Sequence, residues 1–142
     1  MEDRHLCKAR PIGTRKQWVT GFYAVLGEKT VIIVNEPEKF YDVDSGKNSH
    51  GNKIVEVIPK TVCQCTGLKD KNGKLIFEND ILSGHIDDEF PEDETRKRVV
   101  WHENGWCTNE PGCDYYEELD DFDSENFEVI GNMIDNPELL EV

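Results

Sequence analysis

Long apolar runs are absent from the chain. None of its 142 residues lies in a stretch that approaches the roughly 18 consecutive apolar residues of a membrane-spanning helix. The opening residues, MEDRHLCKARP, also lack the apolar core of a secretory signal and begin with acidic charge. We therefore expect no membrane segment and no export, and place the protein in a reducing cytoplasm.

Cysteine occurs five times, but without the spacing typical of a metal site. Structural zinc sites usually separate paired ligands by about two to four residues. Here one residue separates Cys63 from Cys65, and five separate Cys107 from Cys113. An odd number of cysteines in a reducing compartment also disfavours a disulfide framework. We expect free thiols and no bound metal.

Catalytic motifs are missing as well. Gly67 followed by Gly73 and Lys74 resembles a phosphate-binding loop, but five residues separate the two glycines where that motif has four. Leu75 also stands where the motif requires Ser or Thr. Ser83 lies in no nucleophile elbow, and no histidine has the sequence neighbours of a recognisable triad. We expect a protein that is not an enzyme and binds no cofactor.

Basic residues are scarce in the second half of the chain. Residues 72–142 hold 4 Lys or Arg against 21 Asp or Glu, a net charge of −17, whereas residues 1–71 hold 12 against 9, a net charge of +3. A surface this acidic repels phosphate backbones, so nucleic-acid binding is disfavoured except by the weakly basic first half. The acidic half either only keeps the chain soluble or recognises another protein.

The strongest local signal is the stretch from Thr66 to Leu82, TGLKDKNGKLIFENDIL. The pair Asn72-Gly73 between apolar runs predicts a two-residue hairpin turn, because both central residues of such a turn need positive φ. We therefore expect Val62–Leu68 and Lys74–Phe77 to pair as antiparallel strands.

Other parts of the chain carry further secondary-structure signals. The helical spacing of apolar residues predicts a short helix over Tyr115–Phe122, and Asn136 before Pro137 predicts one terminal turn. Polar composition predicts exposed loops over Asp44–Asn52 and Asp87–Arg98. Runs of β-branched and aromatic residues predict strands. These strands are Trp18–Leu26, Thr30–Val34 (ended by Pro37), Phe40–Val43, Ile54–Ile58, Asp80–Gly84, Val99–His102, Gly105–Thr108 and Phe127–Met133.

Short strands at close intervals predict a mostly β fold, a β-rich α+β fold with one or two short helices. A chain of 142 residues is long enough for one domain or two small lobes that share a core. We expect two interlocked β lobes, residues 1–75 and residues 76–142. The second is expected to be an acidic SH3-like barrel, in which a turn ending in Asp80 feeds a strand and a last strand closes the barrel near Ile130.

Several motifs along the chain resemble the YopX family of phage- and prophage-encoded proteins. They are Trp18, Val19 and Gly21, the TGLKDKNG turn, Trp101, Gly105 and Trp106, and the closing segment EVIGNMIDNPELL. The family usually has glycine where this chain has Asn79, which predicts a positive φ there, since asparagine tolerates the left-handed region. It usually has an aromatic residue where this chain has Cys65, which predicts a packing side chain. The resemblance implies a bacterial host cell and names no reaction.

Aromatic and acidic side chains of the second half are the candidate partner-binding residues. On one interpretation, Trp18, Trp101 and Trp106 pack in the cores of the lobes, and we favour this for the tryptophans. On the other, Trp106 and two tyrosines line a groove edged by acids, as in partner-binding SH3-like domains. The candidate residues are Trp106, Tyr115, Tyr116, Asp120, Asp121 and Asp123.

These observations predict a non-catalytic accessory protein that binds an unidentified protein partner through its acidic C-terminal half. The alternative is a nucleic-acid-binding protein, because basic residues interleaved with aromatic ones can hold single strands. Its candidate residues are Arg4, Lys8, Arg10, Arg15 and Lys16, with Trp18 and Tyr23. The sequence leaves the formation of a homo-oligomer open.

Overall fold

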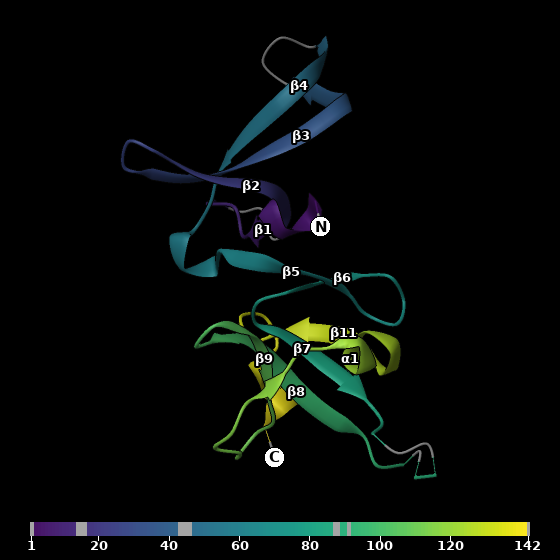
Figure 1. Cartoon of the computed structure of the whole chain (residues 1–142). Coiled ribbons are helices and arrows are strands. Elements are labelled where there is room, and N and C mark those ends of the chain that lie inside the picture. The colour runs from purple at the N-terminus through teal and green to yellow at the C-terminus, as the bar shows by residue number, and fades with distance from the viewer. Residues whose placement is uncertain (1, 14–16, 43–46, 87–88, 91, 142) are drawn as a thin grey trace. The chain divides into compact units, whose positions relative to one another are not determined.

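The computed structural model describes residues 2–13, 17–42, 47–86, 89, 90 and 92–141 (Figure 1). Strands dominate these residues, with one α-helix and three short 3-10 turns among them. The predicted mostly β fold is therefore confirmed. The chain divides into two compact units: unit 1 comprises Met1–Arg4 and Cys65–Val142, and unit 2 comprises His5–Gln64. The predicted lobe boundary after residue 75 falls inside unit 1.

Unit 2 is an antiparallel sheet in which neighbouring strands follow the order β4-β3-β2-β1. Strand β1 also pairs with the first residues of β5, at Cys63 and Gln64. The buried core of this unit is formed by Ala9, Ile32, Val55 and Val57. The strands are β1 (Leu6–Ala9), β2 (Val19–Leu26), β3 (Lys29–Asp42) and β4 (Lys47–Glu56), preceded by the 3-10 turn η1 (Glu2–His5) and followed by η2 (Pro59–Thr61).

Strands β3 and β4 of unit 2 are longer than the sequence predicts. The predicted strands Trp18–Leu26 and Thr30–Val34 correspond to β2 and β3, which pair antiparallel, but Pro37 does not end β3, which continues to Asp42. The pairing of β3 with β4 shifts register between Glu36 and Phe40, and proline is tolerated at such an irregularity because the ladder hydrogen bond is lost there anyway. The predicted loop Asp44–Asn52 is strand from Lys47 onward, and residues 43–46 lie outside the described residues.

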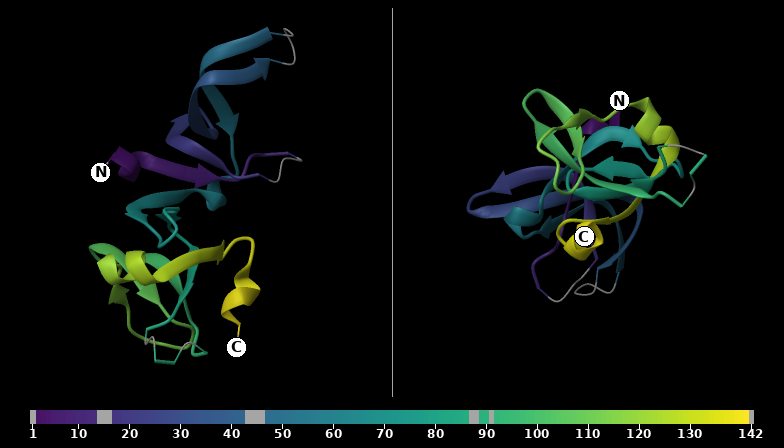
Figure 2. Two further views of the ribbon diagram at one scale, coloured as in Figure 1. Left: turned by 90° about the vertical axis from the view of Figure 1, so that its right-hand side faces the viewer. Right: turned by 90° about the horizontal axis from the view of Figure 1, so that it is seen from below.

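Unit 1 contains a five-stranded antiparallel sheet of order β10-β9-β8-β7-β11. Figure 2 shows helix α1 leading directly into β11, one edge of this sheet. Among the described residues no pairing joins β10 to β11, so the predicted closure of a barrel near Ile130 is not observed, and the SH3-like character of the unit stays a prediction. The elements are β5 (Cys63–Lys69), β6 (Leu75–Phe77), β7 (Asp80–Gly84), β8 (Thr95–His102), β9 (Gly105–Asn109), β10 (Glu117–Glu118), α1 (Asp121–Asn126), β11 (Phe127–Asn132) and η3 (Pro137–Leu140).

The predicted hairpin of β5 and β6 is confirmed, but its turn is of another type. Gly73 has φ 83°, whereas Asn72 is absent from the described non-glycine residues with positive φ. The Gly73 N–H donates to the Asp70 carbonyl at 3.0 Å, and the Asp70 N–H donates to the Lys74 carbonyl at 2.8 Å. This pattern is a type I turn followed by a left-handed glycine, the usual three-residue hairpin loop. At the next turn Asn79 has φ 72°, as predicted.

The helix predicted over Tyr115–Phe122 is wrong. Residues Glu117–Glu118 form the short strand β10, and the only described α-helix begins at Asp121. A capping box fixes this start, because the Asp120 carboxylate accepts from the Asp123 N–H while the Asp123 carboxylate accepts from the Asp120 N–H. Capping therefore outweighs the apolar spacing that suggested an earlier helix.

The start of β8 also differs from the prediction, which assigned its first charged residues to a loop. This strand begins at Thr95, inside the predicted loop Asp87–Arg98, and the side chain of Lys97 is buried within unit 1. Lys97 lies two residues before the buried Val99 in the strand, so both side chains point to the same face of the sheet. Residues 87, 88 and 91 of the predicted loop lie outside the described residues.

The core of unit 1 consists of five buried apolar side chains, with Trp106 packed partly against them. These five are Ile76, Leu82, Val99, Leu119 and Phe127. Cys65 is 1% exposed and is therefore a packing side chain, as predicted. Trp101 is 54% exposed, so the prediction that it lies in a core is wrong, and Trp18 is half-buried in unit 2.

Candidate functional site

A groove of about 600 Å³ opens on unit 1 beside the hairpin of β8 and β9. Its volume is in the range of pockets that hold a small ligand or a few side chains of a partner. Residues of β5, of this hairpin and of the β10 segment form its walls, together with Arg4. The lining residues are Arg4, Thr66, Gly67, Leu68, His102, Glu103, Asn104, Gly105, Trp106, Cys107, Tyr116, Glu118 and Leu119.

Aromatic rings held by stacking form one wall of the groove. The Trp106 ring meets the Trp101 ring edge-on, with centroids 5.1 Å apart and an interplanar angle of 82°. The Tyr116 ring lies parallel to the His102 ring, with centroids 3.9 Å apart and an angle of 12°. Such pairs restrict ring rotation, so the wall is largely formed before any partner arrives.

Carboxylates of Glu103 and Glu118 lie at the groove. Glu103 occupies the tip of the β8–β9 turn with φ 57°, and its side chain is 80% exposed and 3.8 Å from Nε2 of His102. Burial raises the pKa of the Cys107 thiol, and the charges of Glu118 and Glu103 raise it further. A thiol with a raised pKa stays protonated and is a poor nucleophile.

Arg4 lies across the backbone of Gly67 at the groove. A Cβ at Gly67 would be 2.8 Å from Cγ and 3.3 Å from Nε of Arg4, so any other residue would push the arginine away. Gly67 has φ 86°, a region that glycine adopts without strain. The missing side chain and the left-handed backbone together leave a seat for a long, unbranched side chain.

The resemblance to a known family is supported by comparison with known proteins. The family model described as YopX protein matches residues 25–141. The chain belongs to the YopX family. The match includes every groove segment except Arg4, and it starts after Trp18, Val19 and Gly21.

A solved structure is similar to this YopX-family chain. The crystal structure of protein EF1440 from Enterococcus faecalis is similar over 78% of this chain and 75% of that chain, with 26% sequence identity and a TM-score of 0.43. No curated protein matches the chain.

Two of the three predicted aromatic site residues of the YopX-family protein line the groove, and the third does not. Trp106 and Tyr116 both line the groove, whereas Tyr115 is 58% exposed outside the lining. A hydrogen bond with Cys113 is the main cause that raises the pKa of Tyr115, and nearby negative charge adds to it. The Asn109 side chain donates to the carbonyls of Cys113 and Tyr115, both at 3.0 Å, and so fixes this turn.

The predicted acidic site residues lie in and before α1 and do not line the groove. Asp120 is the N-cap of the helix, and Asp121 is exposed in its first turn. Asp123 is 3% exposed and forms a buried ion pair with Lys97, whose Nζ also lies 4.2 Å from the centroid of the Phe127 ring. Asp123 therefore stabilises unit 1 and is not accessible to a partner.

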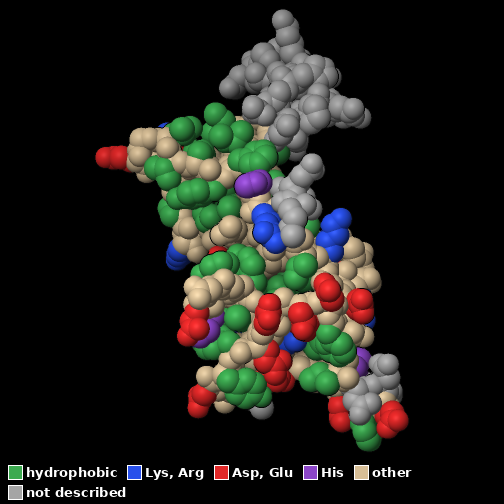
Figure 3. Space-filling model, viewed as in Figure 1, with side chains coloured by type: hydrophobic (Ala, Val, Ile, Leu, Met, Phe, Trp, Pro, Cys, Tyr) green, Lys and Arg blue, Asp and Glu red, His purple; other side chains and the backbone are tan. Residues whose placement is uncertain are grey.

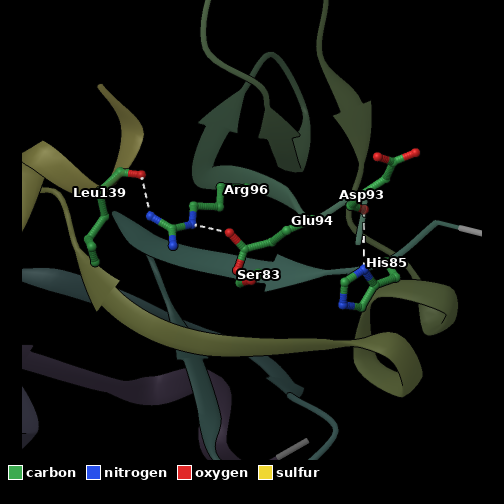
Figure 4. Close-up of polar contacts among 6 residues, drawn as sticks. All are labelled: Ser83, His85, Asp93, Glu94, Arg96 and Leu139. Carbon is green, nitrogen blue, oxygen red and sulfur yellow. Dashed lines mark hydrogen bonds and ion pairs between the residues drawn. The ribbon is translucent and has the colours of Figure 1, made fainter. Parts of the chain in front are cut away.

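A second polar cluster links β7, β8 and the C-terminal turn of the YopX-family fold (Figure 4). The Ser83 hydroxyl and the Arg96 Nε–H each donate to the Glu94 carboxylate at 2.6 Å. The Ser83 bond is the largest cause that lowers the pKa of Glu94, followed by the bond from Arg96. Arg96 also donates to the Leu139 carbonyl at 3.0 Å, which ties η3 to the sheet.

His85 is not part of a triad with the serine of this cluster. Its Nδ1 lies 3.2 Å from the Asp93 carbonyl, and Figure 4 shows its ring apart from Ser83. Ser83 instead donates to a carboxylate whose lowered pKa makes it a weak base. The cluster is thus a set of structural contacts.

Within the described ranges, no group of three or more His, Cys, Asp or Glu side chains is placed to hold a metal ion. None of the helices in those ranges has the length and apolar character needed to cross a membrane.

Proposed function

We propose that this YopX-family protein is a non-catalytic interaction module whose unit 1 binds a segment of another protein in the groove. One observation carries the proposal: a groove of about 600 Å³ combines a fixed aromatic wall with carboxylates at its edge. Rigid aromatic side chains are enriched among residues that contribute most to protein binding, because they bury a large area at low entropic cost.

The charge of unit 1 supports a basic partner. Unit 1 holds 7 Lys or Arg and 24 Asp or Glu, a net charge of −17, whereas unit 2 holds 9 and 6, a net charge of +3. Figure 3 shows acidic side chains distributed over the strands of unit 1, with hydrophobic ones between them. An acidic field of this kind speeds the association of a basic surface and selects against acidic ones.

The chemistry of the groove supports binding without a reaction. Its thiol, Cys107, has a raised pKa, and the ring of His102 is stacked on Tyr116. A catalytic site needs a nucleophile, a base and a stabilising group that converge on one point, and the groove residues are better explained as a recognition surface.

Family membership supports a phage or prophage origin and action in the cytoplasm of a bacterial host cell. The partner is then a protein of the host or of the phage. Its surface carries basic side chains, since it must complement the acidic groove.

A matched pair of double variants tests the proposal. Tyr116→Ala with Glu118→Gln removes an aromatic ring and a charge from the groove, whereas Tyr115→Ala with Glu117→Gln removes the same groups one residue earlier, outside the lining. We expect the tagged wild-type protein to capture one partner from host lysate, the groove variant to retain at least about tenfold less of it, and the control to retain it fully. A loss of about tenfold corresponds to about 1.4 kcal/mol, a usual value for one important interface residue.

Salt dependence completes this test. Because the groove carboxylates are exposed, the captured amount should fall as ionic strength rises. Equal capture by both double variants would remove the support for the groove as the binding site.

A second candidate function is the binding of single-stranded nucleic acid by unit 2. The observation that favours it is a small basic and aromatic cluster: Nζ of Lys8 lies 5.0 Å and Cζ of Arg10 lies 6.0 Å from the centroid of the Trp18 ring. Arg4 belongs to unit 1 and not to this cluster, and Arg15 and Lys16 lie outside the described residues. Tryptophan beside cations is a common stacking platform for bases.

Gel-shift assays at low salt test this second candidate. We expect a labelled 20-nucleotide single strand to be shifted, and Lys8→Ala with Arg10→Ala to weaken binding at least about tenfold while lowering the salt slope by about 0.7 per lost phosphate contact. Lys69→Ala with Lys74→Ala removes the same charge from unit 1 and should leave the shift unchanged. If the wild-type protein shifts neither single-stranded nor duplex probes, this candidate is wrong.

A further inference from the structure

We infer that the groove of unit 1 binds an arginine side chain of its partner, and that Arg4 of this chain occupies the same seat until the partner replaces it. The inference rests on the proposed function and names the chemical group that the groove recognises. Three features of the groove support it: a bare backbone seat, an opposing charge and a weakly held occupant.

The seat is the backbone of Gly67. Because Cγ and Nε of Arg4 approach the missing Cβ position to 2.8 and 3.3 Å, the arginine lies along the glycine backbone. Residues 2–4 belong to unit 1, although the next residues, His5–Gln64, belong to unit 2. The site therefore already holds one long basic side chain.

The opposing charge comes from the two groove carboxylates. Among the groove residues, Arg4 is the only permanently charged cation, and Glu103 and Glu118 are the acids. A guanidinium suits these surroundings better than an ammonium, because it stacks on an aromatic ring and donates two parallel hydrogen bonds to a carboxylate. The Tyr116 ring and the nearby carboxylates offer both kinds of contact.

Arg4 itself is held weakly. It is an exposed residue, and among the side chains that the structure describes none makes an ion pair or a hydrogen bond with its guanidinium. Its side chain packs on Gly67, and its backbone lies in the 3-10 turn η1. A partner arginine that also reaches a carboxylate would bind more strongly, so the exchange is favourable.

Fluorescence anisotropy with short labelled peptides tests this exchange. The probe is a fluorescein-labelled Gly-Leu-Arg-Leu-Gly peptide, and the same peptide with Gln in place of Arg is its control. The proteins are the wild-type chain, Arg4→Ala, and Lys74→Ala, which removes an equal charge from an exposed turn of unit 1 outside the groove.

We expect the arginine peptide to bind Arg4→Ala about tenfold more tightly than the wild-type protein, because an occupied seat lowers the apparent affinity by the fraction of time that it is open. Lys74→Ala should bind it as the wild-type protein does. The glutamine peptide should bind every variant at least about tenfold more weakly, since it lacks the charge. Adding Glu118→Gln to Arg4→Ala should reduce the binding of the arginine peptide.

Three results would each overturn the inference: no binding of the arginine peptide to Arg4→Ala, equal binding of the two peptides, or equal affinity of Arg4→Ala and the wild-type protein for the arginine peptide. Far-ultraviolet circular dichroism of Arg4→Ala controls for folding, and Arg4→Lys, which retains a long basic side chain, should restore part of the competition. If one of these three results is found while the variant Tyr116→Ala with Glu118→Gln still captures less of the partner protein than the wild-type chain, only the arginine inference is wrong. If that capture is also unchanged, the proposed function is wrong with it.

Discussion

Replacing Asp123 with alanine should lower the free energy of unfolding of unit 1 by about 3–5 kcal/mol, because it leaves the buried ammonium of Lys97 without its partner. Both side chains of this ion pair are almost fully buried, at 8% exposure for Lys97 and 4% for Asp123. The substitution also removes half of the capping box at the start of α1. Urea denaturation followed by tryptophan fluorescence measures the loss.

Two further substitutions separate the ion pair from the helix itself. Asp121→Ala changes an exposed residue in the same helical turn and should alter stability by no more than about 0.5 kcal/mol. Lys97→Met combined with Asp123→Leu removes both charges and should recover much of the loss, since apolar side chains replace buried pairs well. If Asp123→Ala is no more harmful than Asp121→Ala, the buried pair does not stabilise unit 1.

Replacing Asp70 with alanine should lower the stability of unit 1 by about 3 kcal/mol, because three backbone donors lose a charged acceptor. Its Oδ1 accepts from the N–H groups of Asn72 and Lys74, and its Oδ2 accepts from the N–H of Val129, each at 2.9 Å. Asp70 is 5% exposed, so water does not replace these bonds readily. The midpoint of urea unfolding reports the change.

The neighbouring residue provides the control for Asp70. Asn72 donates from its side chain to Glu128 at an exposed position, and Asn72→Ala should change stability by less than about 0.5 kcal/mol. Asp70→Asn should fall between the two, because an amide keeps one acceptor oxygen but presents its NH₂ group to a backbone donor. Equal stability of all three variants would show that the carboxylate does not fix the turn.

Turns were the part of the fold that local chemistry predicted best. A left-handed Gly73 follows from the few residues that tolerate this region, and the positive φ at Asn79 was predicted because the family usually has glycine there. The type of the turn before Gly73 could not be predicted, since it depends on Asp70, whose carboxylate holds two turn N–H groups and a strand far along the chain. Local sequence contains no information on that third contact.

Two predictions of secondary structure were wrong, one made from a run of charges and one from the spacing of apolar residues. Lys97 lies in a run of charges that predicts a loop. It is nevertheless buried, because it is two residues from Val99 in the strand and points to the same face of the sheet. The helix predicted over Tyr115–Phe122 did not take account of the Asp120-x-x-Asp123 capping box. This motif is visible in the sequence and marks the start of α1. This second error was avoidable, whereas the burial of Lys97 required knowledge of its partner.

The candidate site was predicted in part. Trp106 and Tyr116 were named from the sequence, and the structure brings them together in one groove. His102 could have been found from its place at the end of the predicted strand Val99–His102, next to the predicted strand Gly105–Thr108. Arg4 and Gly67 carry no shared signal, because about sixty residues of unit 2 separate them in the chain.

The bond between Asp70 and Val129 has a consequence for synthesis on the ribosome. These residues are 59 positions apart, and the carboxylate becomes fully satisfied only when β11 is present. Native contacts this distant in sequence form late, because the intervening chain must first be ordered. A nascent chain that ends before Val129 therefore keeps an incomplete hairpin turn, and unit 1 reaches its final form only after β11 has been synthesised.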